Sequence, residues 1–472
     1  MNVQKTLETI KKNLHRHHQS HLLAFWDRLS GSQRDELLAQ IQRLDFVSIE
    51  RWIRDIIQNE DPHPIRTDFS PPSFYNPYPE GPEQHRKYTR AIELGQELIS
   101  AGKVAAFVVA GGQGTRLGFD GPKGDFPIGP VSNRTLFHLF ADTIAAVSKK
   151  YHVTCPWYVM TSPLNHNQTM DVFQLNHYYG LGTDNVFIFQ QGTLPNFDSD
   201  GKILLADRAR IACSPDGHGG SLKALHKSGA LEDMKQRGIE FISYFQVDNP
   251  LINIFDPLFI GLHALDGAEM SSKALSKNHP KEKVGNFCLI DGKVTVIEYS
   301  DLPDELAEKG NPDGSLVFHL GSIAIHMIDR TFVEKLNAED FALPLHKAVK
   351  KIAQIDEQGH PIESDGIKLE SFVFDALPLA SKSIILETLR HEEFAPTKNA
   401  TGVDSAETSK QMIVDRAADW LESAGVTIPR KPDGSPDCLL EIAPGFALDR
   451  EGLKDKLDEI PTIAPGAKTY LS

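Results

Sequence analysis

The chain has 472 residues, of which 40% are apolar and 24% are charged. This length exceeds that of one typical hydrophobic core, so we expect two or three domains, and the composition excludes a disordered chain. The formal net charge of −15 disfavours nucleic acid and anionic membranes as partners, because both repel an acidic chain. An anionic small molecule would therefore need a local cluster of basic residues.

The sequence has the features of a cytoplasmic protein. The longest apolar run beside a strand signal, Val104–Ala110, is far too short for a membrane span, and the polar N-terminus has no signal-peptide core. The four scattered cysteines form no CxxC pair, which disfavours a disulfide framework or a zinc site. We expect them to be buried free thiols; they are Cys155, Cys213, Cys288 and Cys438.

Residues 1–100 are predicted to form a helical segment, a proline-rich strap and one more helix. Apolar residues recur there at helical spacing, as in the set Leu22, Leu23, Trp26 and Leu29. Ser32 and Asp35 fit a capping box at the start of the second helix. Seven prolines in residues 61–82 exclude a helix interior and indicate an extended strap. A helix is then expected over 83–101, ended by the glycine that follows.

Strand and helix signals alternate over residues 101–395, which we predict to be the main domain. The predicted strands are Val104–Val109, Trp157–Thr161, Val186–Gln190, Phe241–Val247 and Lys293–Glu298. Helical stretches lie between most of them, so we expect an α/β fold with a mixed, mostly parallel sheet and helices on both faces. Residues 396–472 carry one predicted helix at 412–424 and several turns, and are predicted to form a small C-terminal α+β domain.

The strongest local signal is a glycine-rich loop directly after the first strand, in KVAAFVVAGGQGTRLGFDGPKGDFP, residues 103–127. Glycines at this point let backbone N–H groups approach phosphate oxygens, although a tight strand-to-helix turn would need them too. Arg116 and Lys123 add positive charge and favour a nucleotide phosphate loop. The spacing matches neither GxxxxGK[ST] nor GxGxxG, and no GxSxG motif is present.

Other polar residues follow the predicted strands. Asp248 ends the strand ISYFQVDN, where a carboxylate can hold Mg²⁺ with substrate phosphates or simply cap the next turn. Gln190 and Gln191 end another strand, and a glutamine amide there matches the donor and acceptor edge of uracil, but a buried structural role is equally compatible. The motif SPDGHGG places Gly217, Gly219 and Gly220 where a loop enters a helix, and such a loop can approach a flat base or a ribose.

These motifs resemble, in order, those of the eukaryotic-type UDP-sugar pyrophosphorylases, and among them the UDP-N-acetylhexosamine branch. The similarity extends from about residue 100 to 400 through AGGQGTRLG, PKG, QQGTLP, SPDGHGG, FQVDNPL, VIEYSDL, GIKLESFVFD and FAPTKNA. It implies a Rossmann-like nucleotidyltransferase fold of the GT-A-like type. It also implies that UTP and a sugar 1-phosphate form a UDP-sugar and pyrophosphate with Mg²⁺ as cofactor.

The resemblance also implies roles for individual residues. Arg116, Lys123 and Lys398 would be catalytic, and Asp248 would hold the metal. The residues implied to bind UTP are Ala110, Gly111, Gly112, Lys123, Gln191, Gly217, Asp248 and Lys368. The residues implied to bind the sugar are His218, Glu298, Tyr299, Ser322 and Lys398. Without the surrounding motifs, Lys368 and Lys398 would be read as surface lysines, and Glu298 with Tyr299 as a strand end.

Two residues depart from the acetylhexosamine branch and leave the sugar open. His218 and Ser322 stand where that branch usually carries asparagine, and the UDP-glucose branch usually carries histidine at the first of these positions. We expect N-acetylglucosamine 1-phosphate first, with glucose 1-phosphate or broad specificity as alternatives. A UDP-sugar-binding regulator without catalysis is the alternative of another class, although the intact basic residues and Asp248 argue against it. The expected assembly is a monomer or a weak homo-oligomer.

Overall fold

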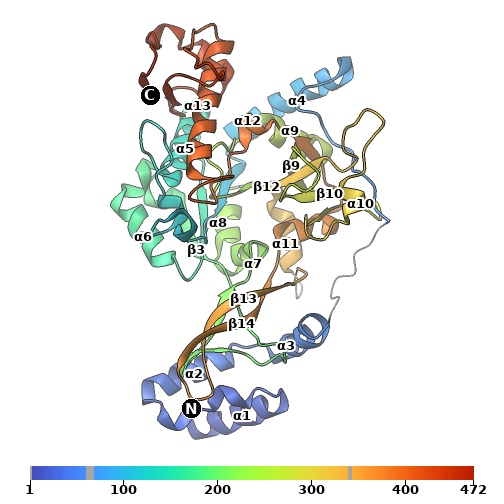
Figure 1. The fold of residues 1–472 in the computed structure, drawn as a ribbon, viewed down its shortest axis with the longest axis vertical. Coiled ribbons are helices and arrows are strands. Elements are labelled where there is room, and N and C mark those ends of the chain that lie inside the picture. Colours follow the sequence, from blue (N-terminus) through green and yellow to red (C-terminus); the bar gives the residue numbers. More distant parts are fainter. Residues whose placement is uncertain (1–2, 60–67, 339–342) are drawn as a thin grey trace. The chain divides into compact units, whose positions relative to one another are not determined.

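The computed structural model of the protein describes residues 3–59, 68–338 and 343–472. Part of the predicted strap at 61–82 therefore lies outside the described residues. The chain divides into two compact units, each built from several segments (Figure 1). Unit 1 comprises Met1–Arg66, Gly192–Gly220 and Ala342–Val373. Unit 2 comprises Thr67–Gln191, Ser221–Phe341 and Phe374–Ser472.

Unit 1 begins with three helices, α1 (Val3–Arg16), α2 (Gly31–Gln42) and α3 (Phe46–Trp52). The expected capping box at Ser32 is wrong, because helix α2 begins earlier. The N-cap is Ser30, whose Oγ accepts from the N–H of Gln33, while the Gln33 side chain accepts from the N–H of Ser30 (3.0 Å). This is the same reciprocal pattern, with glutamine in place of the expected aspartate.

The rest of unit 1 consists of strands that the sequence patterns did not predict. The long antiparallel hairpin of β13 (His346–Ile355) and β14 (Pro361–Glu370) is visible in Figure 1. Four short strands pair two by two, namely β4 (Thr193–Pro195) with β7 (Cys213–Pro215) and β5 (Leu205–Asp207) with β6 (Arg210–Ile211). One apolar core joins these pieces to the helices, with buried residues that include Leu14, Leu22, Leu37, Ile49, Phe197, Ile203 and Leu369.

Unit 2 is built on a mixed sheet in which β11, β10, β12, β8, β1, β2 and β3 are neighbours in this order, with β9 and β15 beside β12 and β9. The four strands β8, β1, β2 and β3 run parallel, whereas β12 pairs antiparallel with β8, β9 and β10. The bounds are β1 (Val104–Val109), β2 (Trp157–Thr161), β3 (Val186–Gln190), β8 (Phe241–Gln246), β9 (Met270–Ser276), β10 (Gly285–Ile290), β11 (Lys293–Ile297), β12 (Leu320–Asp329) and β15 (Ile385–Glu387). The predicted α/β class and all five predicted strands are confirmed.

Helices cover both faces of this sheet. Val104, Ala106 and Val108 point into a core shared with α4 (Gly81–Ser100), α5 (Leu136–Tyr151) and α9 (Pro257–Asp266). The opposite face contacts α8 (Ala230–Gln236), where the Tyr158 hydroxyl donates to Asp233 (2.5 Å). Further helices that precede the C-terminal part are α6 (His166–Leu175), α7 (Gly220–Lys227), α10 (Asp304–Ala307), α11 (Arg330–Asn337) and α12 (Arg390–Glu393). Alternating side chains of β1 therefore serve two separate layers.

The C-terminal residues have a small apolar core of their own within unit 2. It joins α13 (Ala406–Ser423) to α14 (Arg450–Lys454) and to the parallel pair β16 (Leu439–Ile442) and β17 (Lys468–Leu471). The carboxylate of Glu441 connects this part to the loop before α5, since it accepts from the N–H groups of Val131 and Ser132. Among the described residues, no helix is both long and apolar enough to cross a bilayer.

Candidate active site

The glycine-rich loop after β1 folds back on itself. The N–H of Lys123 donates to the carbonyl of Gly112 (3.1 Å), and Gln113 pairs with Pro122 in an isolated bridge. A Cβ added to Gly112 would lie 3.8 Å from Cδ of Lys123. The loop therefore places a basic side chain directly beside exposed glycine backbone, as a phosphate-binding loop requires.

A buried asparagine that the sequence analysis missed supports this loop. Asn165 donates from Nδ2 to the carbonyls of Ala110 (2.8 Å) and Gly112 (3.1 Å), and its Oδ1 accepts from the N–H of Ser162 (2.9 Å). In the sequence, an asparagine just before helix α6 is typical of an N-cap. Its side chain makes no capping hydrogen bond, and it holds the loop at the end of β1 instead.

Gly111 and Gln191 meet at the carboxyl ends of two strands. A Cβ added to Gly111 would lie 2.6 Å from Oε1 of Gln191, so no other residue fits there unless that amide moves. Gln191 is buried, and its N–H donates to the carbonyl of Thr161 at the end of β2 (2.8 Å). The structure therefore brings together a predicted phosphate-loop glycine and the predicted uracil-binding amide.

Lys123 and Asp248 form an ion pair, with Nζ and Oδ2 3.6 Å apart and both side chains 15% exposed. Asp248 follows β8, whose last residue pairs with the last residue of β1, Gln246 with Val109. The two strands therefore deliver the glycine loop and the carboxylate to one edge of the sheet. The carboxyl edge of parallel strands is where α/β proteins bind ligands.

The structure also places the two other basic residues that were predicted to be catalytic, Lys398 and Arg116. Lys398 is half-buried, and the residue before it, Thr397, donates its N–H to the carbonyl of Asp248 (2.8 Å). The backbone just before Lys398 is thereby joined to the backbone of the predicted metal ligand, while the N–H of Lys398 donates to the carbonyl of Asp404 (2.7 Å). Arg116 lies exposed on a single 3₁₀ turn of the glycine loop, so the structure places it on the same loop as Lys123 without fixing its side chain.

Two predicted sugar-binding residues flank a glycine on the antiparallel side of the sheet. Gly285 pairs with Ser322 across β10 and β12. A Cβ added to Gly285 would lie 3.6 Å from Oε1 of Glu298 and 3.8 Å from Cβ of Ser322. Tyr299 follows, with 45% of its surface exposed. The nearest atom to that Cβ would be Cγ1 of Val296 at 2.5 Å, so packing leaves no room for a side chain at Gly285, and no sequence pattern distinguished it from another strand glycine.

Unit 1 holds the loop of Gly217 and His218. Gly217 has a φ of +84°, and an added Cβ would lie 2.3 Å from the carbonyl oxygen of Ser371, so glycine is required there twice over. The ring of His218 stacks on Phe372 with 5.3 Å between centroids, and its Nδ1 accepts from the N–H of Val373 (3.1 Å). In neutral histidine this leaves the proton on Nε2.

Lys368 also belongs to unit 1. It lies on β14, half-buried, with Nζ 2.6 Å from Oε1 of Glu370. A phosphate that approached this ammonium would have to compete with the carboxylate. The phenyl ring of Phe372, which the sequence analysis did not select, lies between His218 and His346, with 4.5 Å between its centroid and that of His346.

The donor set at Asp248 fits a magnesium ion that is shared with a substrate. Mg²⁺ takes one or two carboxylates from a protein and completes its shell with phosphates and water, and Asp248 supplies one at the sheet edge. A second acidic group, His391, Glu392 and Asp419, has ligand atoms within 4.8 Å of one another. It does not favour a cation, because Arg450 already pairs with both Glu392 and Asp419.

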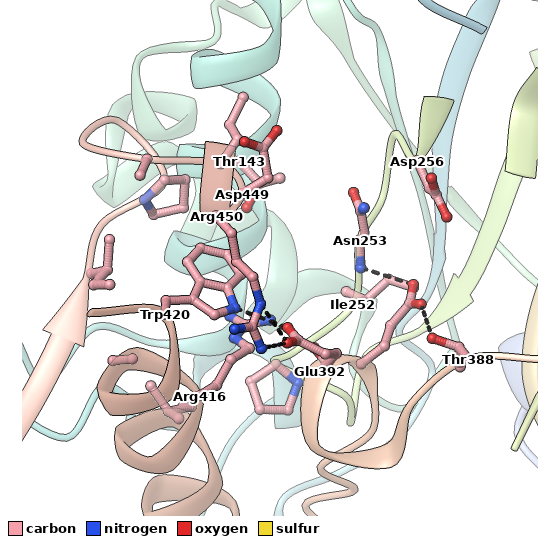
Figure 2. A pocket seen from close by; sticks show the side chains of 18 of the residues that line it. Thr143, Ile252, Asn253, Asp256, Thr388, Glu392, Arg416, Trp420, Asp449 and Arg450 are labelled. Atoms are coloured by element: carbon pink, nitrogen blue, oxygen red, sulfur yellow. Dashed lines mark hydrogen bonds and ion pairs between the residues drawn. The ribbon is translucent and has the colours of Figure 1, made fainter. Parts of the chain in front are cut away.

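A cavity of about 550 Å³ lies between α13 and the loop after β8, and Glu392 and Arg450 are among the residues that line it. Figure 2 shows Trp420 and Arg450 on one side and Asn253 and Thr388 on the other. Burial lowers the pKa of Arg416, which also lines it, to about 10. None of the residues that line this cavity, among those that the structure describes, is a predicted site residue.

Comparison with known proteins places these features in a family. The sequence profile of the family described as UTP–glucose-1-phosphate uridylyltransferase matches residues 80–418. The human "UDP-N-acetylhexosamine pyrophosphorylase-like protein 1" is 36% identical, with 95% of this chain and 94% of that protein aligned. The "UDP-N-acetylglucosamine pyrophosphorylase" of Saccharomyces cerevisiae is 35% identical, with 92% of this chain and 94% of that protein aligned.

A solved structure resembles the whole chain. The crystal structure of the uridine diphosphate N-acetylglucosamine pyrophosphorylase from Trypanosoma brucei, in complex with an inhibitor, superposes with a TM-score of 0.82. The two chains are 26% identical, and the match covers 99% of this chain and 98% of the other. The similarity therefore includes the first hundred and the last seventy residues, where the sequence motifs were weakest.

Proposed function

Since this chain belongs to the family of UTP–glucose-1-phosphate uridylyltransferases, we propose that its sugar substrate is N-acetylglucosamine 1-phosphate. The chain is a nucleotidyltransferase that uses UTP. The relatives named for UDP-N-acetylglucosamine align over nearly the whole chain, which supports this choice of sugar. The main structural support for this reaction is the Lys123–Asp248 ion pair beside the glycine loop. Its positive group can bind the phosphates of UTP, and its negative group can bind a metal ion.

The reaction we propose is an in-line displacement at the α-phosphorus of UTP. An oxygen of the sugar 1-phosphate forms the new P–O bond while the bond to the bridging oxygen breaks and pyrophosphate leaves. No covalent enzyme intermediate is needed, because the nucleophile is already an anion. The protein therefore contributes positioning and charge neutralisation. Arg116 and Lys123 would neutralise the departing pyrophosphate, and Lys398 would hold the phosphate of the sugar.

Asp248 would hold Mg²⁺, which supplies charge neutralisation at the phosphate oxygens when it is bound. For this to happen, Lys123 must release the carboxylate and turn to the phosphates. We therefore expect UTP to bind weakly when the metal is chelated. Calorimetric titration of UTP with Mg²⁺ and with EDTA measures this; equal affinity under both conditions would argue against a metal role for Asp248.

We propose the remaining contacts as follows. Gln191 would pair with the uracil edge, and Ala110, Gly111, Gly112 and Gly217 would present backbone to the nucleotide. Lys368 would meet the phosphates of UTP once it separates from Glu370. The residues proposed to contact the sugar are His218, Glu298, Tyr299 and Ser322. Of these, Glu298 and Ser322 both lie near Gly285, which supports a shared role for the two side chains.

Glucose 1-phosphate is the second candidate, because His218 and Ser322 depart from the acetylhexosamine pattern. A single acetyl contact shifts discrimination by only about 1–3 kcal/mol, so broad specificity is a related alternative. The test is pyrophosphate release from UTP with glucose, N-acetylglucosamine and N-acetylgalactosamine 1-phosphates. We expect the highest kcat/KM with N-acetylglucosamine 1-phosphate. A higher value with glucose 1-phosphate would overturn the choice of sugar but not the reaction.

We further propose that the protein acts in the cytoplasm as a monomer or a weak homo-oligomer. All four cysteines are free thiols, which suits a reducing compartment. Light scattering coupled to size-exclusion chromatography, over a range of protein concentrations, tests the assembly. A dimer that persists on dilution to nanomolar concentration would contradict it.

A further inference from the structure

A buried segment connects helix α12 to Lys398. Its residues Glu393, Phe394, Ala395 and Thr397 are each 7% exposed or less. The segment has no regular secondary structure beyond α12, so strand or helix hydrogen bonds do not fix its register. Its buried polar groups therefore need partners from other parts of the fold, both side chains and backbone. The position of Lys398 depends on those partners.

Asn249 clamps this segment from the end of β8. Its Nδ2 donates to the carbonyl of Glu393 (2.7 Å), and its Oδ1 accepts from the N–H of Ala395 (3.0 Å). The side-chain amide of Asn249 therefore bonds to the backbone on both sides of Phe394, through its N–H and its oxygen. Asn249 directly follows Asp248, so the clamp ties the segment to the predicted metal ligand itself.

A second polar contact holds the segment from helix α13. The Ser409 hydroxyl donates to the carbonyl of Ala395 (3.1 Å) and accepts from the Thr397 hydroxyl (2.9 Å). The N–H of Thr397 in turn donates to the carbonyl of Asp248 (2.8 Å). All of these groups are buried, so each bond is more costly to lose than at the surface.

The start of the segment is anchored by a buried ion cluster. Lys273 lies 2.6 Å from both carboxylate oxygens of Glu393 and 2.7 Å from Asp256. Burial alone would lower the pKa of Lys273, but the two carboxylates outweigh it and hold that pKa above its ordinary value. Glu393 also accepts from the N–H of Asn253 and the hydroxyl of Thr388, the two contacts drawn at the right of Figure 2. The segment is therefore fixed at its start. At its end, the Asn249 and Ser409 side chains act together with two backbone hydrogen bonds, from the N–H of Thr397 to Asp248 and from the N–H of Lys398 to the carbonyl of Asp404 (2.7 Å).

We propose that Asn249 is a positioning residue that sets the place of Lys398 relative to Asp248, and that Ser409 assists it. This inference rests on the roles proposed above for Asp248 and Lys398. The carboxylate itself does not depend on the clamp, because Val247 donates its N–H to the carbonyl of Val109 and keeps the end of β8 on the sheet (3.1 Å). Loss of the clamp should therefore displace Lys398 and leave the binding of UTP with Mg²⁺ intact.

The first experiment compares Asn249→Ala with Asn337→Ala in the full chain. Asn337 is a matched control, since its Nδ2 also donates to two backbone carbonyls, those of Leu222 on α7 and Val333 on α11, and it is not one of the proposed site residues. We expect Asn249→Ala to lower kcat/KM for the sugar 1-phosphate by about 10²-fold, the scale of a 1 Å misplacement. The affinity for UTP with Mg²⁺ should stay at the wild-type value, and Asn337→Ala should keep wild-type kinetics. Equal kcat/KM in both variants, or a loss of UTP affinity in the first, would overturn the inference.

The second experiment asks whether Asn249 acts through Lys398. In a double-mutant cycle, Asn249→Ala should add no further loss of kcat/KM to Lys398→Ala, because groups that act as a unit are not additive. Additive losses would overturn the positioning role alone. A fully active Lys398→Ala variant would instead refute the role proposed for Lys398, and the clamp with it. If Asn249→Ala fails to fold, Ser409→Ala replaces it, because this variant removes only one hydroxyl. We expect Ser409→Ala to lower kcat/KM for the sugar 1-phosphate by a smaller factor than Asn249→Ala. A wild-type kcat/KM in Ser409→Ala would contradict the inference.

Discussion

In the protein without substrate, the charges of Lys123 and Asp248 neutralise each other. Both side chains are largely withdrawn from water, where an isolated charge would be costly. A triphosphate with its metal can replace each partner by a stronger one, since the ammonium then meets phosphate and the carboxylate meets a cation. The ion pair is therefore a resting arrangement of the site, and each half has a separate part in the proposed reaction.

Replacement of Lys123 by alanine should lower kcat by about 10²–10³-fold, which corresponds to about 3–4 kcal/mol of lost charge stabilisation. The matched control is Lys335→Ala, which removes an exposed lysine paired with Glu269 (3.2 Å) and should leave kcat unchanged. Steady-state pyrophosphate release measures both variants. An unchanged kcat in Lys123→Ala would remove this lysine from the mechanism.

The cysteines divide by exposure, and the expectation that all four are buried is wrong for one. Cys155, Cys288 and Cys438 are buried, whereas Cys213 on β7 is exposed. Burial raises the pKa of Cys155 to about 11 and that of Cys288 to about 12, so neither forms the reactive thiolate near neutral pH. Labelling of the native protein with a thiol reagent at pH 8 should modify Cys213 first, and Cys213→Ser should abolish this rapid phase. Rapid labelling of the variant would contradict the burial of the other three.

Charged residues of the site were easier to predict than the residues that hold them. Lys123 and Asp248 stand next to glycines and at a strand end, where charge and position point to phosphate chemistry. Asn165 and Asn249 make their contacts to backbone that is distant in the sequence, at Ala110 and Glu393. An asparagine has the same local pattern whether it caps a turn or clamps a remote segment, so the sequence alone could not separate these roles.

At the level of elements, the four adjacent parallel strands of the main sheet were predictable, whereas several antiparallel strands were not. The parallel strands β1, β2, β3 and β8 are apolar runs because both of their faces are covered. Much of β13 is exposed, with lysines at successive positions, and it therefore lacks an alternating apolar pattern. The antiparallel pairing of β10 with β12 also escaped prediction, since strand direction depends on the path between elements.

Helices α4 and α9 pack through glycines that leave no room for a side chain. A Cβ added to Gly95 would lie 1.9 Å from the carbonyl oxygen of Pro257, and one added to Gly261 would lie 1.7 Å from that of Ala91. Because the opposing atoms are backbone, the helices would have to separate. We expect Gly95→Ala and Gly261→Ala each to lower the free energy of unfolding by about 1–3 kcal/mol or more.

Urea denaturation of the two variants measures this effect. Gly445→Ala is the control, because Gly445 has an ordinary φ and no atom within 4 Å of an added Cβ. Its midpoint should equal or slightly exceed that of the wild type, since alanine reduces the freedom of the unfolded chain. If Gly95→Ala unfolds at the same urea concentration as this control, the two helices do not pack as closely as described.

On the scale of the whole molecule, one compact unit is assembled from three separate stretches of sequence. The N-terminal helices supply residues such as Leu14 and Leu37 to a core completed by Phe197 and Leu369. No local sequence pattern indicates that these stretches share a core, because the residues that contact one another are more than a hundred positions apart in the chain. The sequence could therefore indicate helices at the start of the chain but not what they pack against.

This assembly predicts how the chain opens. Leu37 is fully buried in unit 1, and Leu37→Ala should cost about 2–5 kcal/mol of that unit's stability. Backbone amides in 192–220 and 343–373 should then exchange faster along with those of the N-terminal helices, because a cooperative unit opens as a whole. Hydrogen exchange followed by mass spectrometry resolves these segments. Leu136→Ala, equally buried in unit 2, should accelerate exchange in unit 2; acceleration by Leu37→Ala confined to the N-terminal helices would show that the three stretches do not form one unit.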